Sequence, residues 1–159
     1  MIHGEIFGVA KNINIAIFGK GLVGGTLIKQ ILKSHDNLLK RKKICLNIFA
    51  VANSTKVLLD KNGVTDSWEN DLYTAGKVQY SIQDVIEFAE QHHLENLVAI
   101  DNTASSEFIQ HYSTLVENGF DLISSNKVPE KPFPRTARII SNAIESLFNA
   151  GQVLYPNTI

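Results

Sequence analysis

The stretch Gly19-Lys20-Gly21-Leu22-Val23-Gly24 decides the fold of this chain. It follows an apolar run, Ile13 to Phe18, and opens a segment with helical apolar spacing, Leu22 to Ser34. Strand, glycine-rich turn and helix in this order are the context of a dinucleotide-binding fingerprint. The first glycine permits a tight turn, the second lets the backbone approach a pyrophosphate, and the third lets helix and strand pack together. The helix N-terminus then offers N–H groups and partial positive charge to the phosphates. An ordinary strand–helix turn is the alternative interpretation.

Two further segments carry clear signals of secondary structure. Leu46 to Ala52 is almost wholly apolar, which is typical of a strand buried on both faces. Ser81 precedes an apolar helical pattern and has Asp84 three residues on, which predicts that a helix begins there. The segment Asn53 to Gly76 is ambiguous, with a short helix around Trp68 as one interpretation. We expect Trp68 to be a packing residue and not a stacking platform.

The alternation of strands and helices continues to the end of the chain. The other predicted elements are strands over Leu97–Ile100, Phe120–Ser124 and Val153–Tyr155, a helix from Ser105 or Ser106 to about Asn118, a rigid connection through Pro129, Pro132 and Pro134, and a last helix to about Ala150. Strands alternating with helices imply right-handed crossovers and an α/β fold, a Rossmann-type doubly wound and mostly parallel sheet. Ligands bind beyond the carboxyl ends of the strands in such sheets. The candidate site residues are therefore Gly19–Gly24, Asn53–Ser54, Thr103–Ser105 and Asn126–Lys127.

Composition indicates one globular domain. The chain has 159 residues, 44% of them hydrophobic and 19% charged, which suits a packed core. A net charge of −1 argues against binding to nucleic acid or to an anionic membrane. One cysteine, Cys45, excludes an internal disulfide framework, fits a reducing compartment, and is predicted to be an inert core thiol. No apolar run approaches the roughly 18 residues of a membrane span. We see no signal peptide in Met1 to Lys11, so a cytoplasmic protein is expected.

Several other features carry weaker signals. The basic run Lys40-Arg41-Lys42-Lys43 is predicted to be a solvated loop between a helix and a strand, with a phosphate contact as the alternative. Four histidines lack ligand spacing or a partner cysteine, so no metal site is expected: His35, His92, His93 and His111.

The end of the second strand bears on the choice of cofactor. A site selective for NAD usually offers an acid to the ribose hydroxyls at this point. Here the strand ends with Asn53 and Ser54, which can bond a ribose or a 2′-phosphate without repelling it. Lys56 would neutralise such a phosphate if it points inward. This favours tolerance of NADP or weak discrimination, whereas a plain turn is the alternative, because Asn and Ser are common turn residues.

The next two strand ends offer small and polar residues. After the third strand, Thr103 is a candidate to bond a cofactor near its nicotinamide end, while Ser105 and Ser106 are predicted to cap a helix. After the fourth strand, Lys127 is placed to hold an anion or to assist proton transfer. A solvated surface lysine is the alternative.

These strand ends, taken in order, resemble the nucleotide-binding domain of homoserine dehydrogenase, in particular the form fused to aspartate kinase. The matching pieces are Ile17 to Gly25, Val51 to Ser54, Ile100 to Ser105, and Gly119-Phe120 leading to Ser125-Asn126-Lys127. The similarity runs from about Asn12 to Lys127 and more weakly to Ile159. Residues Ile2 to Phe7 also resemble the end of a regulatory kinase segment, so 1–12 is expected to be a linker and 13–159 the NAD(P)-binding domain.

The resemblance implies NAD(P)-linked interconversion of aspartate 4-semialdehyde and homoserine, a step in threonine and methionine biosynthesis. It assigns the proton chemistry to Lys127. By position, the residues implied to bind NADP or NAD are Phe18, Gly19, Gly21, Leu22, Val23, Gly24, Ala52, Asn53, Ser54, Thr103, Ala104 and Lys127. A homo-oligomer is expected for the full enzyme, with a small-molecule substrate.

The chain also departs from this family pattern. After Lys127 the family usually continues with another lysine and a small residue, but Val128 and Pro129 stand here. The family's Asp-Thr-Asn type of stretch appears near the end as Pro156-Asn157-Thr158. The substrate domain that should follow is missing, so we expect a fragment that binds cofactor and is nearly inactive alone. A non-catalytic NAD(P)-sensing module is the alternative, with a flavin- or S-adenosylmethionine-binding relative as a third possibility.

Overall fold

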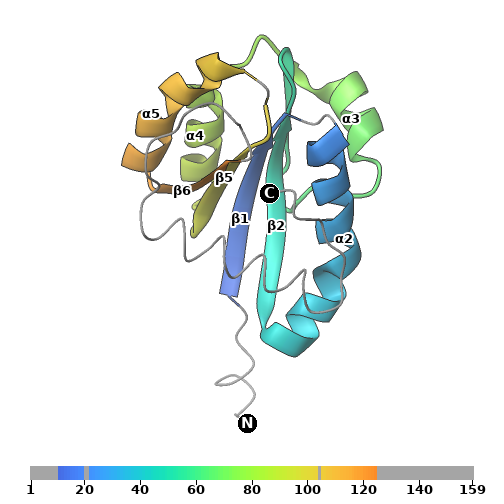
Figure 1. Cartoon of the computed structure of the whole chain (residues 1–159). Helices are drawn as coiled ribbons and strands as arrows, with labels where there is room; N and C mark the ends of the chain where they lie inside the picture. The colour runs from blue at the N-terminus through green and yellow to red at the C-terminus, as the bar shows by residue number, and fades with distance from the viewer. Residues whose placement is uncertain (1–10, 20–21, 104, 125–159) are drawn as a thin grey trace.

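The computed structural model describes residues 11–19, 22–103 and 105–124, and within them the strands form one six-stranded sheet (Figure 1). The strand order is β4-β3-β2-β1-β5-β6. The strands are β1 (Lys11–Phe18), β2 (Ile44–Ala52), β3 (Lys56–Leu59), β4 (Lys77–Val78), β5 (Leu97–Asp101) and β6 (Phe120–Ser124). The pairs β2–β1, β1–β5 and β5–β6 are parallel, whereas β3 and β4 add an antiparallel edge. The predicted α/β fold with a mostly parallel sheet is confirmed.

Helices cover both faces of the sheet (Figure 1). On one face lie α2 (Leu22–Lys42) and α3 (Trp68–Ala75), and on the other lie α4 (Ile82–Gln91), the 3-10 helix η1 (Ser106–His111) and α5 (Tyr112–Glu117). Two apolar clusters follow this division. One joins Ile28 and Ile31 of α2 to β1 and β2, and the other joins Val85 of α4 and Leu115 of α5 to β5 and β6. The sheet is therefore the middle of three layers.

The strand order contains a reversal of direction at β1. The chain passes from β1 to β2 on one side and later returns to place β5 on the other side of β1. Phe18, the last residue of β1, is paired with Ala52 of β2 and with Asp101 of β5. The carboxyl ends of β1 and β5 therefore form the switch point, where ligands of doubly wound sheets bind.

Near the middle of these strands, a pair of asparagines joins β1 to β2. Asn14 is only 5% exposed, and its Oδ1 accepts a hydrogen bond of 2.8 Å from Nδ2 of Asn47. Asn14 Nδ2 donates to the carbonyl oxygen of Glu95, 2.6 Å away, in the connection that precedes β5. The two asparagines face each other in the strand register. The carboxamides thereby satisfy polar groups that burial would otherwise penalise.

The prediction that the basic run forms a loop is wrong. Helix α2 continues past Ser34 to Lys42, so Lys40, Arg41 and Lys42 form its last turn. Positive side chains there are stabilised by the partial negative charge of the helix C-terminus. Lys43, with a φ of 58°, ends the helix in the left-handed conformation.

The ambiguous segment contains more order than its sequence indicates. The helix at Trp68 is confirmed as α3, and Trp68 is a packing residue with 7% exposure. The short strands β3 and β4 were not predicted, because four and two residues are too few to show an alternating pattern.

Three predicted helix boundaries lie close to the observed ones. Ser81 caps α4 with a capping box to Asp84, Ser105 caps η1, and α5 ends at Glu117 with Asn118 as its C-cap. The single helix predicted from Ser105 or Ser106 to about Asn118 is divided into the 3-10 helix η1 and α5. The elements predicted over Pro129–Ala150 and Val153–Tyr155 lie outside the described residues.

Candidate functional site

The first glycine of the fingerprint forms the turn at the switch point. Gly19 has a φ of +92°, and its N–H donates to the carbonyl oxygen of Ala52, 2.8 Å away. A Cβ atom at this position would stand 2.7 Å from the carbonyl carbon of Asn102 and 2.8 Å from the nitrogen of Thr103. Both the left-handed conformation and the backbone across the turn therefore require glycine. The close approach leaves bare main chain between the ends of β1 and β5.

Gly24 packs the first turn of α2 against the same bend. A Cβ atom on Gly24 would collide with the carbonyl oxygen of Gly19. This is the close helix–strand packing that the fingerprint assigns to its third glycine. Leu22 and Val23 occupy the first two positions of α2, so the N-terminus of this helix begins directly after the bend. Gly21 lies outside the described residues.

The turn after β2 is held by the side chain of Asn53. Its Oδ1 accepts hydrogen bonds from the backbone N–H groups of Thr55 (2.8 Å) and Lys56 (2.7 Å). Its carbonyl oxygen accepts from the hydroxyl of Tyr80, 3.1 Å away, whose pKa is raised by burial. Asn53 is therefore a turn residue, which was the alternative interpretation from the sequence. A contact of Asn53 or of the exposed Ser54 with a cofactor stays a prediction.

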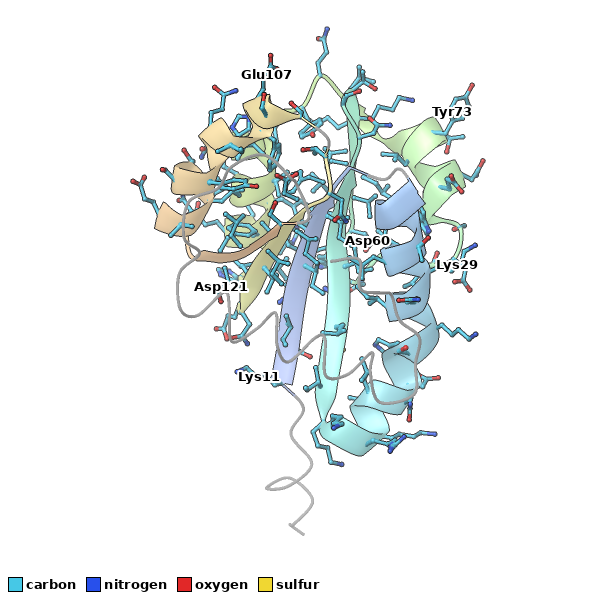
Figure 2. The ribbon with its side chains drawn as sticks, in the orientation of Figure 1. Lys11, Lys29, Asp60, Tyr73, Glu107 and Asp121 are labelled. Carbon is cyan, nitrogen blue, oxygen red and sulfur yellow. The ribbon has the colours of Figure 1, made fainter. Side chains whose placement is uncertain are left out.

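Lys56 does not fulfil the condition set for a phosphate contact. Its Nζ donates to the carbonyl oxygen of Tyr73, 2.6 Å away, and lies 5.0 Å from the centroid of the Tyr73 ring. Tyr73 belongs to the last turn of α3 and lies on the outer side of that helix (Figure 2). The lysine therefore compensates the negative end of a helix instead of facing the end of β2.

The turn after β5 is organised by a buried acid that the sequence analysis did not assign. Asp101 is fully buried, with 0% exposure. Its Oδ1 accepts from the N–H (2.9 Å) and the hydroxyl (2.6 Å) of Thr103, and its Oδ2 accepts from the hydroxyl of Tyr112 (2.6 Å). The signal in the sequence was an acid that ends the apolar strand Leu97–Ile100, since buried acids require donors. Ala104 and Lys127 lie outside the described residues.

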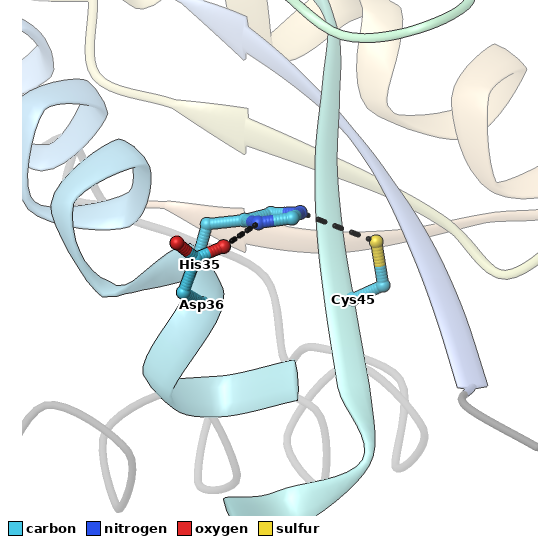
Figure 3. A network of polar contacts seen from close by, with 3 residues as sticks. All are labelled: His35, Asp36 and Cys45. Atoms are coloured by element: carbon cyan, nitrogen blue, oxygen red, sulfur yellow. Dashed lines mark hydrogen bonds and ion pairs between the residues drawn. The ribbon is translucent and has the colours of Figure 1, made fainter. Parts of the chain in front are cut away.

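Cys45 lies far from this edge, near the start of β2. It is half-buried and not part of the core, which corrects the predicted location. Its Sγ lies 3.4 Å from Nε2 of His35, and Nδ1 of His35 lies 3.4 Å from Oδ1 of Asp36 (Figure 3). Burial raises the pKa of the Cys45 thiol, which disfavours the reactive thiolate.

Two negative findings concern the described residues. They contain no cluster of three or more His, Cys, Asp or Glu side chains placed to hold a metal ion. None of their helices combines the length and the apolar character that a membrane crossing needs.

A parallel sheet with a glycine-only bend at its switch point and a helix N-terminus behind it defines a dinucleotide-binding domain of the Rossmann type. Residues 19–134 match the family described as "Homoserine dehydrogenase, NAD binding domain". Because this match covers most of the chain, the chain belongs to that family of NAD-binding domains.

Individual relatives agree with this assignment. The bifunctional aspartokinase/homoserine dehydrogenase of Haemophilus influenzae is 35% identical over 127 residues, which are 79% of this chain and 15% of that protein. The homoserine dehydrogenase of Schizosaccharomyces pombe is 25% identical over 146 residues, 90% of this chain and 38% of that protein. The chain therefore spans only a minor part of either relative.

Solved structures support the fold. The homoserine dehydrogenase of S. aureus superposes with a TM-score of 0.55 at 15% sequence identity. The alignment covers 89% of this chain and 31% of that one. At this identity the likeness concerns the architecture alone.

Proposed function

We propose that this chain is the NAD(P)-binding portion of a homoserine dehydrogenase, of the kind joined to an aspartokinase. The observation that carries the proposal is the bend at Gly19, where a Cβ atom would fill the space between β1 and β5. The fit of the residues to a dinucleotide is good, because bare backbone and a helix N-terminus together accept a pyrophosphate. The family match supplies the enzyme class.

The strand order supports one direction for the cofactor. With its pyrophosphate at the bend after β1, one half would extend over the end of β2 and the other over the ends of β5 and β6. The adenosine half would meet Asn53 and Ser54, and the nicotinamide half would meet Thr103 and Ala104. Neither Asn53 nor Ser54 carries charge, and Lys56 is held by Tyr73, so we expect NADP and NAD to be only weakly discriminated.

The chemistry proposed for the whole enzyme interconverts aspartate 4-semialdehyde and homoserine. The bound nicotinamide supplies or accepts the hydride. The residues of this chain hold the cofactor against the sheet edge, exclude water from one side of it, and, through Lys127, deliver or remove the proton at the substrate oxygen. Phe18 and Ala52 end the two strands that support the pyrophosphate and contribute backbone to the site.

Alone, this portion is proposed to bind cofactor and to be nearly inactive. The chain spans 15% of the length of the bifunctional H. influenzae protein and 38% of the S. pombe enzyme. We propose that groups that bind the substrate lie in the other regions of a full-length enzyme. Positioning two reactants contributes about 7–11 kcal/mol to catalysis at most, and half of a site does not supply it. A homo-oligomer and a small-molecule substrate are proposed for the full enzyme only.

Calorimetric titration of the chain with NADP and with NAD tests the proposal. We expect Gly21→Val to abolish binding of both, because a side chain there would occupy phosphate space. The variant should remain folded, as judged by its circular dichroism. Gly119→Ala is the control for replacing a glycine away from the site: its φ of +91° strains the alanine, but its Cβ would meet nothing within 4 Å in the turn before β6, so cofactor binding should be unchanged. Normal binding by Gly21→Val would exclude the proposed phosphate site.

A further inference from the structure

Asp101 is one of two polar or charged residues that are buried among the described residues, the other being Asn14. It is the last residue of β5, and the register places it between Phe18 of β1 and Ser124 of β6. A carboxylate in such a position needs hydrogen-bond donors to offset the loss of water. Its place at the switch point puts those donors beside the proposed cofactor site.

The donors to Asp101 include groups from the turn after β5 and from α5. Thr103, in the turn after β5, supplies its N–H and its hydroxyl at 2.9 and 2.6 Å. Tyr112, the first residue of α5, supplies its hydroxyl at 2.6 Å. The oxygen of Tyr112 also lies 3.0 Å from Oγ of Ser124, at the end of β6. Asp101 therefore ties the turn that carries Thr103 to α5 and to the last residue of β6.

The hydrogen bond to Asp101 fixes the direction in which the Thr103 hydroxyl points its hydrogen. A hydroxyl has one hydrogen to donate and two lone pairs to accept with. A carboxylate oxygen only accepts, so at 2.6 Å the hydrogen of Thr103 is directed at Asp101. The N–H of Ser105 lies 3.4 Å from Thr103 Oγ1, which is a long contact. Toward other partners, Thr103 Oγ1 therefore acts as an acceptor.

Thr103 is also placed against the glycine bend. Its backbone nitrogen is 2.8 Å from the point where a Cβ of Gly19 would stand, and its side chain is half-buried. In the strand order this is the β5 side of the bend, over which the nicotinamide riboside half of a dinucleotide would extend. That half carries N–H donors on its carboxamide and O–H donors on its ribose.

We propose that Asp101 is a positioning residue that holds Thr103 as a hydrogen-bond acceptor for an N–H or O–H group of the nicotinamide riboside half. This inference rests on the proposed function and adds one detail to it. At Thr103 the site binds a ligand group that donates a hydrogen bond, and it disfavours a ligand group that can only accept one. Asp101 acts through Thr103 and does not touch the cofactor.

The test compares Asp101→Leu with Thr103→Val in the full 159-residue chain. Leu has nearly the shape of Asp but no oxygen atom, so it offers no acceptor for the Thr103 hydrogen. Val keeps the shape of Thr without the hydroxyl. Each variant is titrated with the nicotinamide dinucleotide that binds the wild type more tightly and with ADP, which lacks the nicotinamide riboside half.

We expect both variants to weaken binding of the dinucleotide about 3- to 10-fold, the range for one hydrogen bond. Binding of ADP should stay within about twofold, because a general structural defect would weaken both ligands. The double variant should be no weaker than Thr103→Val, since Asp101 acts through Thr103. Thr103→Ser, which keeps the hydroxyl, should restore binding. Tyr112→Phe is the matched control, because it removes a donor to Asp101 without touching Thr103.

Several outcomes would overturn the inference. Equal losses for the dinucleotide and ADP would reduce Asp101 to a structural role, and additive losses in the double variant would make the two residues independent. If Asp101→Leu does not fold, unchanged dinucleotide binding by Thr103→Val still contradicts the inference. A wild-type chain that binds neither NADP nor NAD would overturn the proposed function and this inference with it.

Discussion

At the end of β2, Asn53 closes the turn with its side-chain oxygen, and the exposed Ser54 stands next to it. The residue types at this point were readable from the sequence, but the turn contacts were not, because they depend on where Thr55 and Lys56 place their N–H groups. Lys56 is the clearest case. Its charge suggested a phosphate partner, while the structure gives it the carbonyl oxygen of Tyr73, seventeen residues away.

Replacing Ser54 by Asp tests the part of the proposed site that would hold the 2′ position of the adenosine ribose. A carboxylate beside the 2′ position repels a phosphate and accepts hydrogen bonds from ribose hydroxyls. We expect Ser54→Asp to weaken NADP relative to NAD about 10-fold, a ratio that corresponds to about 1.4 kcal/mol. Titration with both cofactors measures it. Ser54→Asn is the uncharged control, and equal loss of both cofactors would remove Ser54 from the 2′-phosphate site.

Among the elements, α4 shows the best agreement between sequence and structure. Its first residue follows a cap in which Ser81 and Asp84 bond each other's backbone N–H groups, 3.3 and 2.8 Å apart. Such local signals are readable because their partners are three residues apart. The length of α2 was not readable in this way. Its last turn is polar, and it is stabilised by charge at the helix end and not by an apolar stripe.

The cap of α4 gives a prediction about stability. We expect Ser81→Ala to lower the free energy of unfolding by about 1 kcal/mol, because the helix loses the side-chain acceptor of its cap. Urea unfolding measures the change, and cofactor binding should not alter. Ser67→Ala is the comparison: Ser67 precedes α3 and makes no side-chain cap hydrogen bond, although its hydroxyl donates to Asp71 at 2.9 Å. An unchanged free energy of unfolding for Ser81→Ala would show that the box at Ser81 does not contribute to the stability of α4.

For the whole molecule, the parallel core and its switch point followed from the order of apolar segments. The antiparallel edge formed by β3 and β4 could not be predicted, because these strands are too short to show an alternating apolar pattern. The hydrogen bonds around the buried Asp101 were also not predicted. In the sequence, an acid after an apolar run indicates only that a strand ends there. The fold brings Tyr112 to Asp101 and Ser124 to Tyr112.

The reaction itself belongs to the scale of the complete enzyme. In the full-length dehydrogenase, we expect Lys127→Ala to lower turnover about 10²- to 10⁴-fold, the usual contribution of a general acid or base. Steady-state assay of homoserine oxidation measures it, with cofactor affinity determined in parallel. Lys131→Ala, a neighbouring lysine, serves as the comparison. An unaltered rate would return Lys127 to the solvated surface.

The asparagine pair between β1 and β2 has a consequence for how the molecule assembles. If β2 slipped by one residue along β1, the buried Oδ1 of Asn14 would lose its donor Asn47, at a cost of about 1–3 kcal/mol. Mispaired forms are thereby disfavoured. The same two strands end at Phe18 and Ala52, so a polar bond in the middle of the strands favours the alignment that brings these two ends together at the glycine bend.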